Sequence, residues 1–250
     1  MDLFWTCLSF LAGAIFGSFF NVVGLRVPKK IPFSNDRSYC PNCEKQLHWY
    51  ELIPIISFII QFGTCRNCQT RISFIYPFIE LVTGILFVYA YMKIGLHLEL
   101  ITALLLISML MIIVVTDLSY MVIPNKILLF FLPFFILLRT LSPLEPWYNA
   151  VFGAAIGFLL IALIIFFSKG GMGAGDMKLF GVLGVVLGIG NVLLTFFIAA
   201  CLGAIIGSIL MIVKRVNRKQ AIPFGPYIVV GALISYFYGN NIIQAYLSLL

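Results

Sequence analysis

Long, nearly uncharged apolar runs follow one another through this sequence, and they constrain its fold more than any other feature. Residues 101–116, for example, are apolar almost throughout and end at Asp117. Hydrophobic residues make up 62% of the chain and charged residues only 10%, and the mean hydropathy is +1.09. A water-soluble domain does not carry such a composition. We therefore expect an all-α polytopic membrane protein.

Charged residues and Pro or Gly breaks divide the chain into about eight candidate transmembrane helices. They are expected at residues 3–25, 73–93, 100–116, 127–140, 148–168, 178–190, 191–213 and 223–244. The first run follows the acidic Asp2 and is longer than a signal-peptide core, so we expect it to be retained as a helix. The span at 178–190 is short, and local thinning of the bilayer around it would bring water toward Asp176.

The basic residues predict an orientation. If the spans alternate across the membrane with the amino terminus outside, fourteen of the 16 Lys and Arg residues face the cytosol, and only Lys93 and Arg139 do not. Cytosolic loops are enriched in Lys and Arg, so both Asp117 and Asp176 are expected at the cytosolic face. The net charge of +7 needs no nucleic-acid partner. The basic run at residues 214–219 lacks stacking aromatics and is expected to hold a helix end against anionic lipid.

Two aspartates stand where apolar helices are expected to end. Asp117 closes one run, and Asp176 lies in the glycine-rich break at residues 170–178. A carboxylate at the edge of lipid is costly and is usually functional or paired, although a solvated Asp176 in an ordinary turn is the alternative. Glycines free the backbone and leave room for an approaching peptide. The expected active-site loop comprises Gly173, Gly175 and Lys178.

Two carboxylates that share one site cannot both ionise easily, so the pair holds a proton. One aspartate can then activate water while the other protonates a carbonyl. Which of Asp117 and Asp176 is the base stays open, because a coupled pair titrates jointly. The stretch at residues 222–226 is rigid and contains a glycine, so it is suited to lining the same cavity.

Four cysteines form two Cys-x-x-Cys pairs in the only sizeable polar segment, residues 26–72. The pairs are Cys40 with Cys43 and Cys65 with Cys68, and 21 residues separate them. Tetrahedral zinc accepts four thiolates, and each pair supplies two of them. Two disulfides are the alternative, but they are rare in a reducing cytosol. His48 is a further possible ligand, although four thiols suffice. We expect a small cytosolic zinc-binding loop domain.

Other features of the apolar sequence point to helix packing or to the membrane surface. Glu80 carries a charge into the second span and is either functional or a partner for an arginine such as Arg26. Asn21 is expected to hydrogen-bond to another helix or to reach the active cavity. Residues 48–60 are too short to span and should lie on the membrane or on the bundle. Close helix packing is expected at Gly13/Gly17, Gly153/Gly157 and Gly203/Gly207.

Together, the motifs resemble the type IV prepilin leader peptidases, membrane enzymes that also N-methylate their product. The resemblance extends over nearly the whole chain. It is carried by Gly17-Ser-Phe-x-Asn21-Val with Arg26 and Pro28, the two cysteine pairs, the stretch from Trp49 to Pro54, Tyr76-Pro-x-x-Glu80, Asp117 with Ile123-Pro-Asn125, Gly173-x-Gly-Asp176-x-Lys178, and Pro223-Phe-Gly-Pro226. The glycine–aspartate motif alone is shared with presenilin-like proteases.

The resemblance implies a GxGD aspartic endopeptidase with Asp117 and Asp176 as catalytic residues at the cytosolic face of the bacterial cytoplasmic membrane. Its substrates would be prepilins or pseudopilins, which serve type IV pili, type II secretion or competence. They would be cut after the glycine that ends a short basic leader. S-adenosylmethionine would then methylate the new amino terminus, with Glu80 and Gly84 as candidate residues for binding the methyl donor.

The expected organisation has three parts. Residues 1–25 form the first transmembrane helix, residues 26–72 a zinc-knuckle domain associated with methyl transfer, and residues 73–250 the peptidase bundle. Two other functions compete with this interpretation: a secondary transporter with the aspartates as a proton relay, and a non-catalytic zinc-bearing scaffold. Two observations argue against a transporter: both aspartates are expected at one face of the membrane, and the sequence shows no inverted repeat. Changing either aspartate separates a peptidase from a scaffold.

Overall fold

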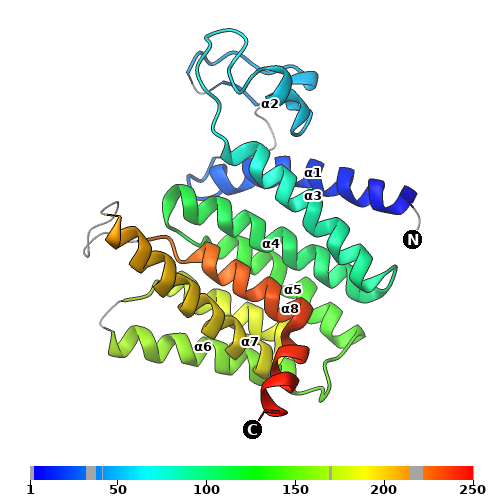
Figure 1. Cartoon of the computed structure of the whole chain (residues 1–250), viewed down its shortest axis with the longest axis vertical. Helices are drawn as coiled ribbons and strands as arrows, with labels where there is room; N and C mark the ends of the chain where they lie inside the picture. The colour runs from blue at the N-terminus through cyan, green and yellow to red at the C-terminus, as the bar shows by residue number, and fades with distance from the viewer. Residues whose placement is uncertain (1–2, 32–37, 41, 169–170, 214–221, 250) are drawn as a thin grey trace. The chain divides into compact units, whose positions relative to one another are not determined.

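The computed structural model describes residues 3–31, 38–40, 42–168, 171–213 and 222–249, and within these ranges the chain is helical (Figure 1). The α-helices are α1 (Leu3–Arg26), α2 (Ile56–Ile60), α3 (Ile75–Ile94), α4 (Leu98–Tyr120), α5 (Asn125–Leu141), α6 (Asn149–Phe167), α7 (Ala174–Ile212) and α8 (Gly225–Leu247), with a 3₁₀ turn η1 (Trp49–Leu52). The described ranges contain two isolated β-bridges and no strand. The predicted all-α class is confirmed.

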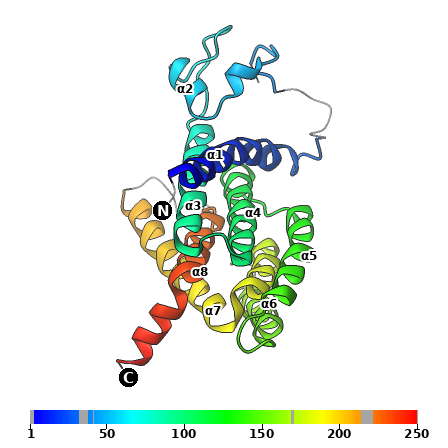
Figure 2. The same cartoon turned by 90° about the vertical axis from the view of Figure 1, so that its right-hand side faces the viewer.

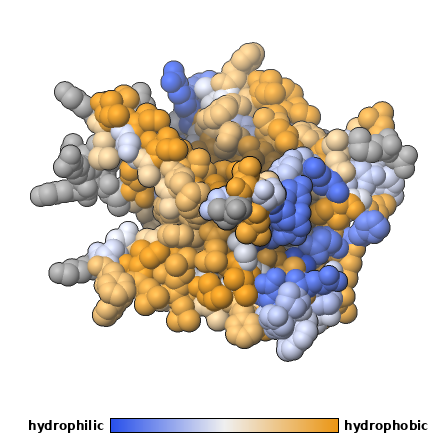
Figure 3. Space-filling model, turned by 60° about the horizontal axis from the view of Figure 1, so that its bottom comes forward, coloured by the Kyte–Doolittle hydropathy of each residue, from blue (hydrophilic) through white to orange (hydrophobic). Residues whose placement is uncertain are grey.

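Among the residues that the structure describes, six helices are long and apolar enough to cross a membrane: α1, α3, α4, α6, α7 and α8. The predicted count of eight spans is not confirmed. Helix α5 has only 17 residues, and α7, with 39 residues, contains both of the predicted spans 178–190 and 191–213. Many large apolar side chains are exposed on these helices, as on the face shown in Figure 3, and lipid is the solvent that suits them. The basic run at 214–219 lies outside the described residues.

The chain divides into two compact units, residues 1–115 and 116–250. In the first unit, α1 packs closely on α3. A Cβ atom added at Gly13 would lie 2.8 Å from the Cα of Gly84, and one added at Gly17 would lie 2.8 Å from the Cα of Glu80. The Asn21 amide donates to the Tyr76 carbonyl of α3 at 3.2 Å. The predicted small-residue packing at Gly13/Gly17 is confirmed, and Asn21 bonds to another helix.

A small lobe with η1 and α2 lies between α1 and α3 in sequence and beyond the start of α3 in space (Figures 1 and 2). It is the predicted polar segment between the first two long helices. Its apolar stretch forms only two short helical pieces, η1 and α2, so it does not span. Ile56, Ile59 and Ile60 of this stretch are exposed.

In the second unit, α6 and α8 each pack on α7. A Cβ atom added at Gly153 or Gly157 would lie 2.5 Å from a carbonyl oxygen of α7, so the predicted close approach of these glycines is confirmed. The two glycines of the third predicted pair, Gly203 and Gly207, have different surroundings. A Cβ atom added at Gly203 would lie 3.1 Å from the Phe224 ring, whereas one added at Gly207 would make only an ordinary contact with Ile222 at 3.7 Å.

Helix α7 is broken at Gly188, whose φ of +76° lies in the left-handed region. The buried guanidinium of Arg139 donates to the Val186 carbonyl from Nε and Nη2, at 3.0 and 2.7 Å. The Ile189 N–H donates to the Asn149 side-chain oxygen at 2.8 Å. These contacts supply partners for backbone groups that the break removes from the helix ladder. The predicted boundary between residues 190 and 191 is therefore displaced to Gly188.

Candidate active site and metal centre

Asp117 is buried in the last turn of α4. The helix continues past it to Tyr120, and the chain turns at Met121 with a φ of +52°. The prediction that Asp117 ends the helix is therefore wrong by one turn. The Gly225 N–H, at the start of α8, donates to Asp117 Oδ2 at 2.7 Å. This contact joins two segments 108 positions apart in the sequence.

Asp176 lies in the first turn of α7. Helix α7 begins at Ala174, so Gly175, Asp176 and Lys178 are helical and only Gly173 precedes the helix. The predicted active-site loop is thus shorter than expected. The Gly173 N–H donates to Asp176 Oδ2 at 3.0 Å. An acidic side chain that caps a helix amino terminus in this way satisfies an otherwise unpaired N–H and faces the positive end of the helix dipole.

The structure brings the two aspartates together. Their carboxylates are close enough to interact electrostatically, and both belong to the second unit. Two further contacts join the same segments. The Lys178 ammonium donates to Asn125 Oδ1 at 3.1 Å, and a Cβ atom added at Gly175 would lie 3.0 Å from the Cβ of Ile123.

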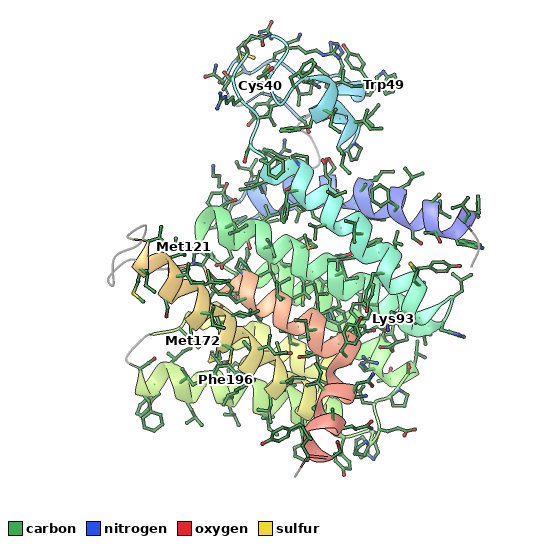
Figure 4. The ribbon with its side chains drawn as sticks, viewed as in Figure 1. Cys40, Trp49, Lys93, Met121, Met172 and Phe196 are labelled. Atoms are coloured by element: carbon green, nitrogen blue, oxygen red, sulfur yellow. The ribbon has the colours of Figure 1, made fainter. Side chains whose placement is uncertain are left out.

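Each aspartate is held in the same way. Among the described residues, the hydrogen bonds to Asp117 and Asp176 come from glycine N–H groups and engage Oδ2. Oδ1 of each carboxylate makes no hydrogen bond to the described residues. Met121 follows Asp117 by four positions, and Met172 precedes Asp176 by four positions. Both methionines are labelled at the left of Figure 4.

Gly225 is a site residue that sequence reasoning did not single out. A Cβ atom added there would lie 2.7 Å from Asp117 Oδ2 and 2.9 Å from its Cγ, so a side chain would displace the carboxylate. The sequence feature that points to Gly225 is the stretch at residues 222–226, which is predicted to line the cavity. Nothing in its sequence says that a backbone N–H would meet Asp117.

Glu80 and Gly84 lie on α3 in the first unit and are both buried. Glu80 Oε2 accepts the N–H of Ile55, the residue that precedes α2, at 2.7 Å, and Ser18 bonds to the same carboxyl group. A Cβ atom added at Gly84 would lie 2.9 Å from the Phe10 ring of α1. Helix packing therefore accounts for the glycine at position 84, and Glu80 links α3 to the lobe.

The four predicted cysteines converge in the lobe. Their sulfur atoms all lie within 4.8 Å of one another. The Cys40 and Cys68 sulfurs are 3.7 Å apart, and those of Cys43 and Cys65 are 4.0 Å apart. A tetrahedral zinc ion with bonds of about 2.3 Å would place its sulfur ligands about 3.8 Å from one another. The donor set and its spacing therefore fit a four-thiolate metal site.

Both pairs are built from the same turn. The N–H of the first cysteine donates to the carbonyl five residues on: Cys40 to Lys45 at 3.0 Å and Cys65 to Thr70 at 2.9 Å. Among the described residues of each turn, one has a positive φ, +55° at Glu44 and +58° at Gln69. The two turns bring the four sulfur atoms within 4.8 Å of one another. The spacing of the cysteines predicted the cluster, and the structure confirms it.

Hydrogen bonds to the second cysteine of each turn favour its thiolate form. The side chain and then the backbone of Thr70, followed by the Asn42 side chain, lower the pKa of the Cys68 thiol to about 5. The Lys45 backbone and the Asn67 side chain also lower the pKa of Cys43. A thiolate is the form that binds a metal, so a lowered pKa reduces the proton competition that zinc meets at neutral pH.

Two family models match the sequence in succession. The model of the bacterial peptidase A24 N-terminal domain matches residues 11–94, and that of the type IV leader peptidase family matches residues 104–208. The first match contains Glu80, Gly84 and the four cysteines, and the second contains Asp117 and Asp176. No solved structure matches the chain.

Several curated proteins named prepilin leader peptidase/N-methyltransferase are similar to this chain. The protein of Bacillus subtilis (strain 168) is 45% identical over 240 residues, which cover 96% of this chain and 97% of that protein. The protein of Aeromonas salmonicida (strain A449) is 32% identical over 271 residues, covering 96% and 93%. The protein of Legionella pneumophila is 33% identical over 216 residues, covering 84% and 75%.

Proposed function

Because the chain belongs to the type IV leader peptidase family, we propose that it removes the leader from type IV prepilins or pseudopilins and N-methylates the new amino terminus. The similarity extends over 96% of this chain and 97% of the Bacillus subtilis protein, whose name includes both activities. It favours an enzyme over a transporter or a scaffold. The chain is then a membrane-embedded hydrolase with methyltransferase activity.

The peptidase reaction is assigned to Asp117 and Asp176. The single observation that carries this assignment is geometric: contacts between their segments bring the two aspartates to one site, where Oδ2 of each is held by a glycine N–H. Two carboxylates that share one site cannot both ionise easily, so the pair holds one proton. The ionised carboxylate takes a proton from water as the water attacks the scissile carbonyl, and the neutral one protonates that carbonyl oxygen.

The site is assigned to the cytosolic face of the bacterial cytoplasmic membrane, with lipid around the helices and no nucleic-acid partner. The supporting observations are the distribution of the basic residues and the apolar helices. Met121 is exposed just after Asp117. A cysteine there, with native cysteines outside the lobe removed, should be protected from an impermeant thiol reagent in intact cells. Labelling from outside would contradict this orientation.

The four-cysteine cluster is proposed to hold a structural zinc ion. The support is the thiolate donor set and the distances between the sulfur atoms. A lobe this small buries too little apolar surface to be stable without a staple, and zinc binding adds directly to its folding free energy. The lobe, residues 26–72, is proposed to serve methyl transfer, while residues 73–250 carry the peptidase and residues 1–25 the first transmembrane helix.

Methyl transfer is proposed to use S-adenosylmethionine, which supplies the methyl group. Its sulfonium is cationic, so a carboxylate suits it, and Glu80 lies where α3 meets the lobe. Gly84 is proposed to contribute indirectly, by letting α1 approach α3. The residues of this chain then have separate tasks: the lobe and Glu80 orient the new amino terminus, and the aspartates act on the peptide bond.

Intact-mass analysis of a prepilin co-expressed with the protein tests both activities, because leader loss and methylation change the mass separately. We expect Asp117→Asn and Asp176→Asn each to abolish leader removal while the protein remains inserted. Glu145→Gln is the matched control, since it makes the same change of carboxylate to amide at an exposed loop residue. Substantial cleavage by either Asp→Asn variant would exclude the two-aspartate mechanism.

A further inference from the structure

The second unit contains an apolar groove that the reaction described above does not use. Its volume is about 680 Å³. Ten of its lining residues are apolar, and the two polar ones are Asn125 and Lys178. The lining comes from three helices: Asn125, Leu128, Leu129 and Leu132 of α5; Ala154, Ala155, Phe158 and Leu159 of α6; and Lys178, Gly181, Val182 and Val185 of α7.

The spacing of these residues shows how the groove is built. On α7 they recur at intervals of three and four, so they form one face of that helix. The same spacing occurs on α5. Because α5 and α6 both pack on α7, α7 forms the floor and the other two helices the walls. From Lys178 to Val185 the floor extends for about 10 Å along α7, at 1.5 Å per residue.

The polar end of the groove meets the candidate active site. Lys178 follows Asp176 by two residues in the first turns of α7, and its ammonium donates to Asn125 Oδ1 at 3.1 Å. Asn125 begins α5, soon after Asp117 and the turn at Met121. An apolar segment in the groove would therefore enter it next to the two carboxylates.

We propose that this groove binds the apolar helix of the substrate, the segment on the carboxyl-terminal side of the bond that is cut. The proposal rests on the function proposed above. The expected leader is short and basic, so the chain that runs from the carboxylates into this apolar groove is the segment on the other side of the bond. That chain must be helical there, because lipid leaves no other partners for its backbone.

The chemistry of the groove favours a peptide over a lipid acyl chain. Small residues such as Ala154, Ala155 and Gly181 let a helix approach closely, which is how helices associate within lipid. Lys178 and the Asn125 amide can donate to carbonyls of the extended peptide at the mouth of the groove, where the substrate is not helical. The hydrocarbon part of a lipid has no group for these donors, and only its headgroup offers acceptors.

Photo-crosslinking tests the occupant directly. The photoreactive residue p-benzoylphenylalanine replaces Leu159, which lines the groove and is 57% exposed. The full-length protein carries Asp117→Asn and is irradiated in membranes with a prepilin. The control places the same residue at Ile209 of α7, which is 52% exposed and outside the groove. We expect a covalent adduct with the prepilin from position 159 and none from position 209.

A second variant reports on binding rather than on proximity. Ala155→Trp should fill the groove and lower kcat/KM for the prepilin at least tenfold, with most of the change in KM. The matched control is Ala204→Trp, an equally large change at an exposed alanine outside the groove, which should leave kcat/KM unchanged.

Each outcome separates the two proposals. Adducts with lipid alone, or equal prepilin adducts from positions 159 and 209, would overturn the groove proposal, as would normal KM in Ala155→Trp. Failure of the proposed function has a different signature: the protein with both aspartates intact would leave the prepilin uncut. The adduct at position 159 does not require cleavage, so it reports the occupant in either case.

Discussion

The Gly225 N–H donates to Asp117 Oδ2 at 2.7 Å, and this hydrogen bond ties the start of α8 to the last turn of α4. The contact is buried and brings backbone, not side chain, to the carboxylate. A glycine is needed because an added Cβ atom would lie 2.7 Å from the accepting oxygen. The position of one proposed catalytic group therefore depends on the absence of a side chain on another helix.

Gly225→Ala should reduce leader cleavage by about 100-fold, because a displacement of about 1 Å in a reacting group can cost that much. The substitution adds one methyl group, so the protein should still insert and retain its helices. The measurement is the cleavage rate of a prepilin in detergent or vesicles. Gly207→Ala is the control, since its added Cβ atom would contact only Ile222 at 3.7 Å. A wild-type rate in Gly225→Ala would contradict the positioning role.

The sequence predicted the parts of this fold that depend on local pattern. Apolar runs between charged residues gave the long helices, and the spacing of Cys40, Cys43, Cys65 and Cys68 gave the metal cluster. Both depend on residues that are close in sequence or of one chemical type. Asp117 and Asp176 were paired through the expected orientation of the helices, and the structure brings the two together.

The features that were missed depend on distant contacts. The break in α7 could have fallen at any of several glycines, and the partners Arg139 and Asn149 come from other helices to hold it at Gly188. Helix α4 continues past Asp117 because no residue there stops it before Met121. The Gly225 contact is of the same kind, since a motif shows a glycine but not the residue it faces.

Arg139→Met should destabilise the protein by about 1–3 kcal/mol, the cost of leaving a buried acceptor such as the Val186 carbonyl without a donor. Arg139→Lys should cost less, because an ammonium can still donate once. The measurement is the midpoint of thermal unfolding in detergent. Lys93→Met serves as the control for loss of a basic residue, since Lys93 is exposed. Equal midpoints for Arg139→Met and Lys93→Met would show that the guanidinium does not support the break.

Removing one cysteine pair, Cys65→Ser with Cys68→Ser, should lower the zinc content from about one ion per chain to none, because a tetrahedral site needs four ligands. The lobe should then unfold and become sensitive to protease. Methylation should be lost, while leader cleavage persists at a reduced rate. Elemental analysis and intact mass measure these effects.

The control for cysteine loss is Cys7→Ser with Cys201→Ser. Both cysteines are exposed in apolar helices and stand outside the cluster. This variant should retain its zinc and both activities. Zinc-free protein with unchanged methylation would refute the role given to the metal, and complete loss of cleavage from a stably inserted cluster variant would refute the separation of the two activities.

Glu80 allows its structural and chemical roles to be separated. Its Oε2 accepts the Ile55 N–H at 2.7 Å, and this bond links α3 to the lobe. Glu80→Gln keeps an oxygen that can accept the same N–H but removes the negative charge, so leader cleavage and the fold of the lobe should be unchanged. If the carboxylate attracts the cationic methyl donor, methylation should fall by roughly 10- to 100-fold, as expected for loss of an interaction with a charged group.

Glu80→Leu also removes the acceptor and should loosen the lobe, which limited proteolysis would detect. Methylation at the normal rate in Glu80→Gln, together with its loss in Glu80→Leu, would assign Glu80 to the link between α3 and the lobe alone.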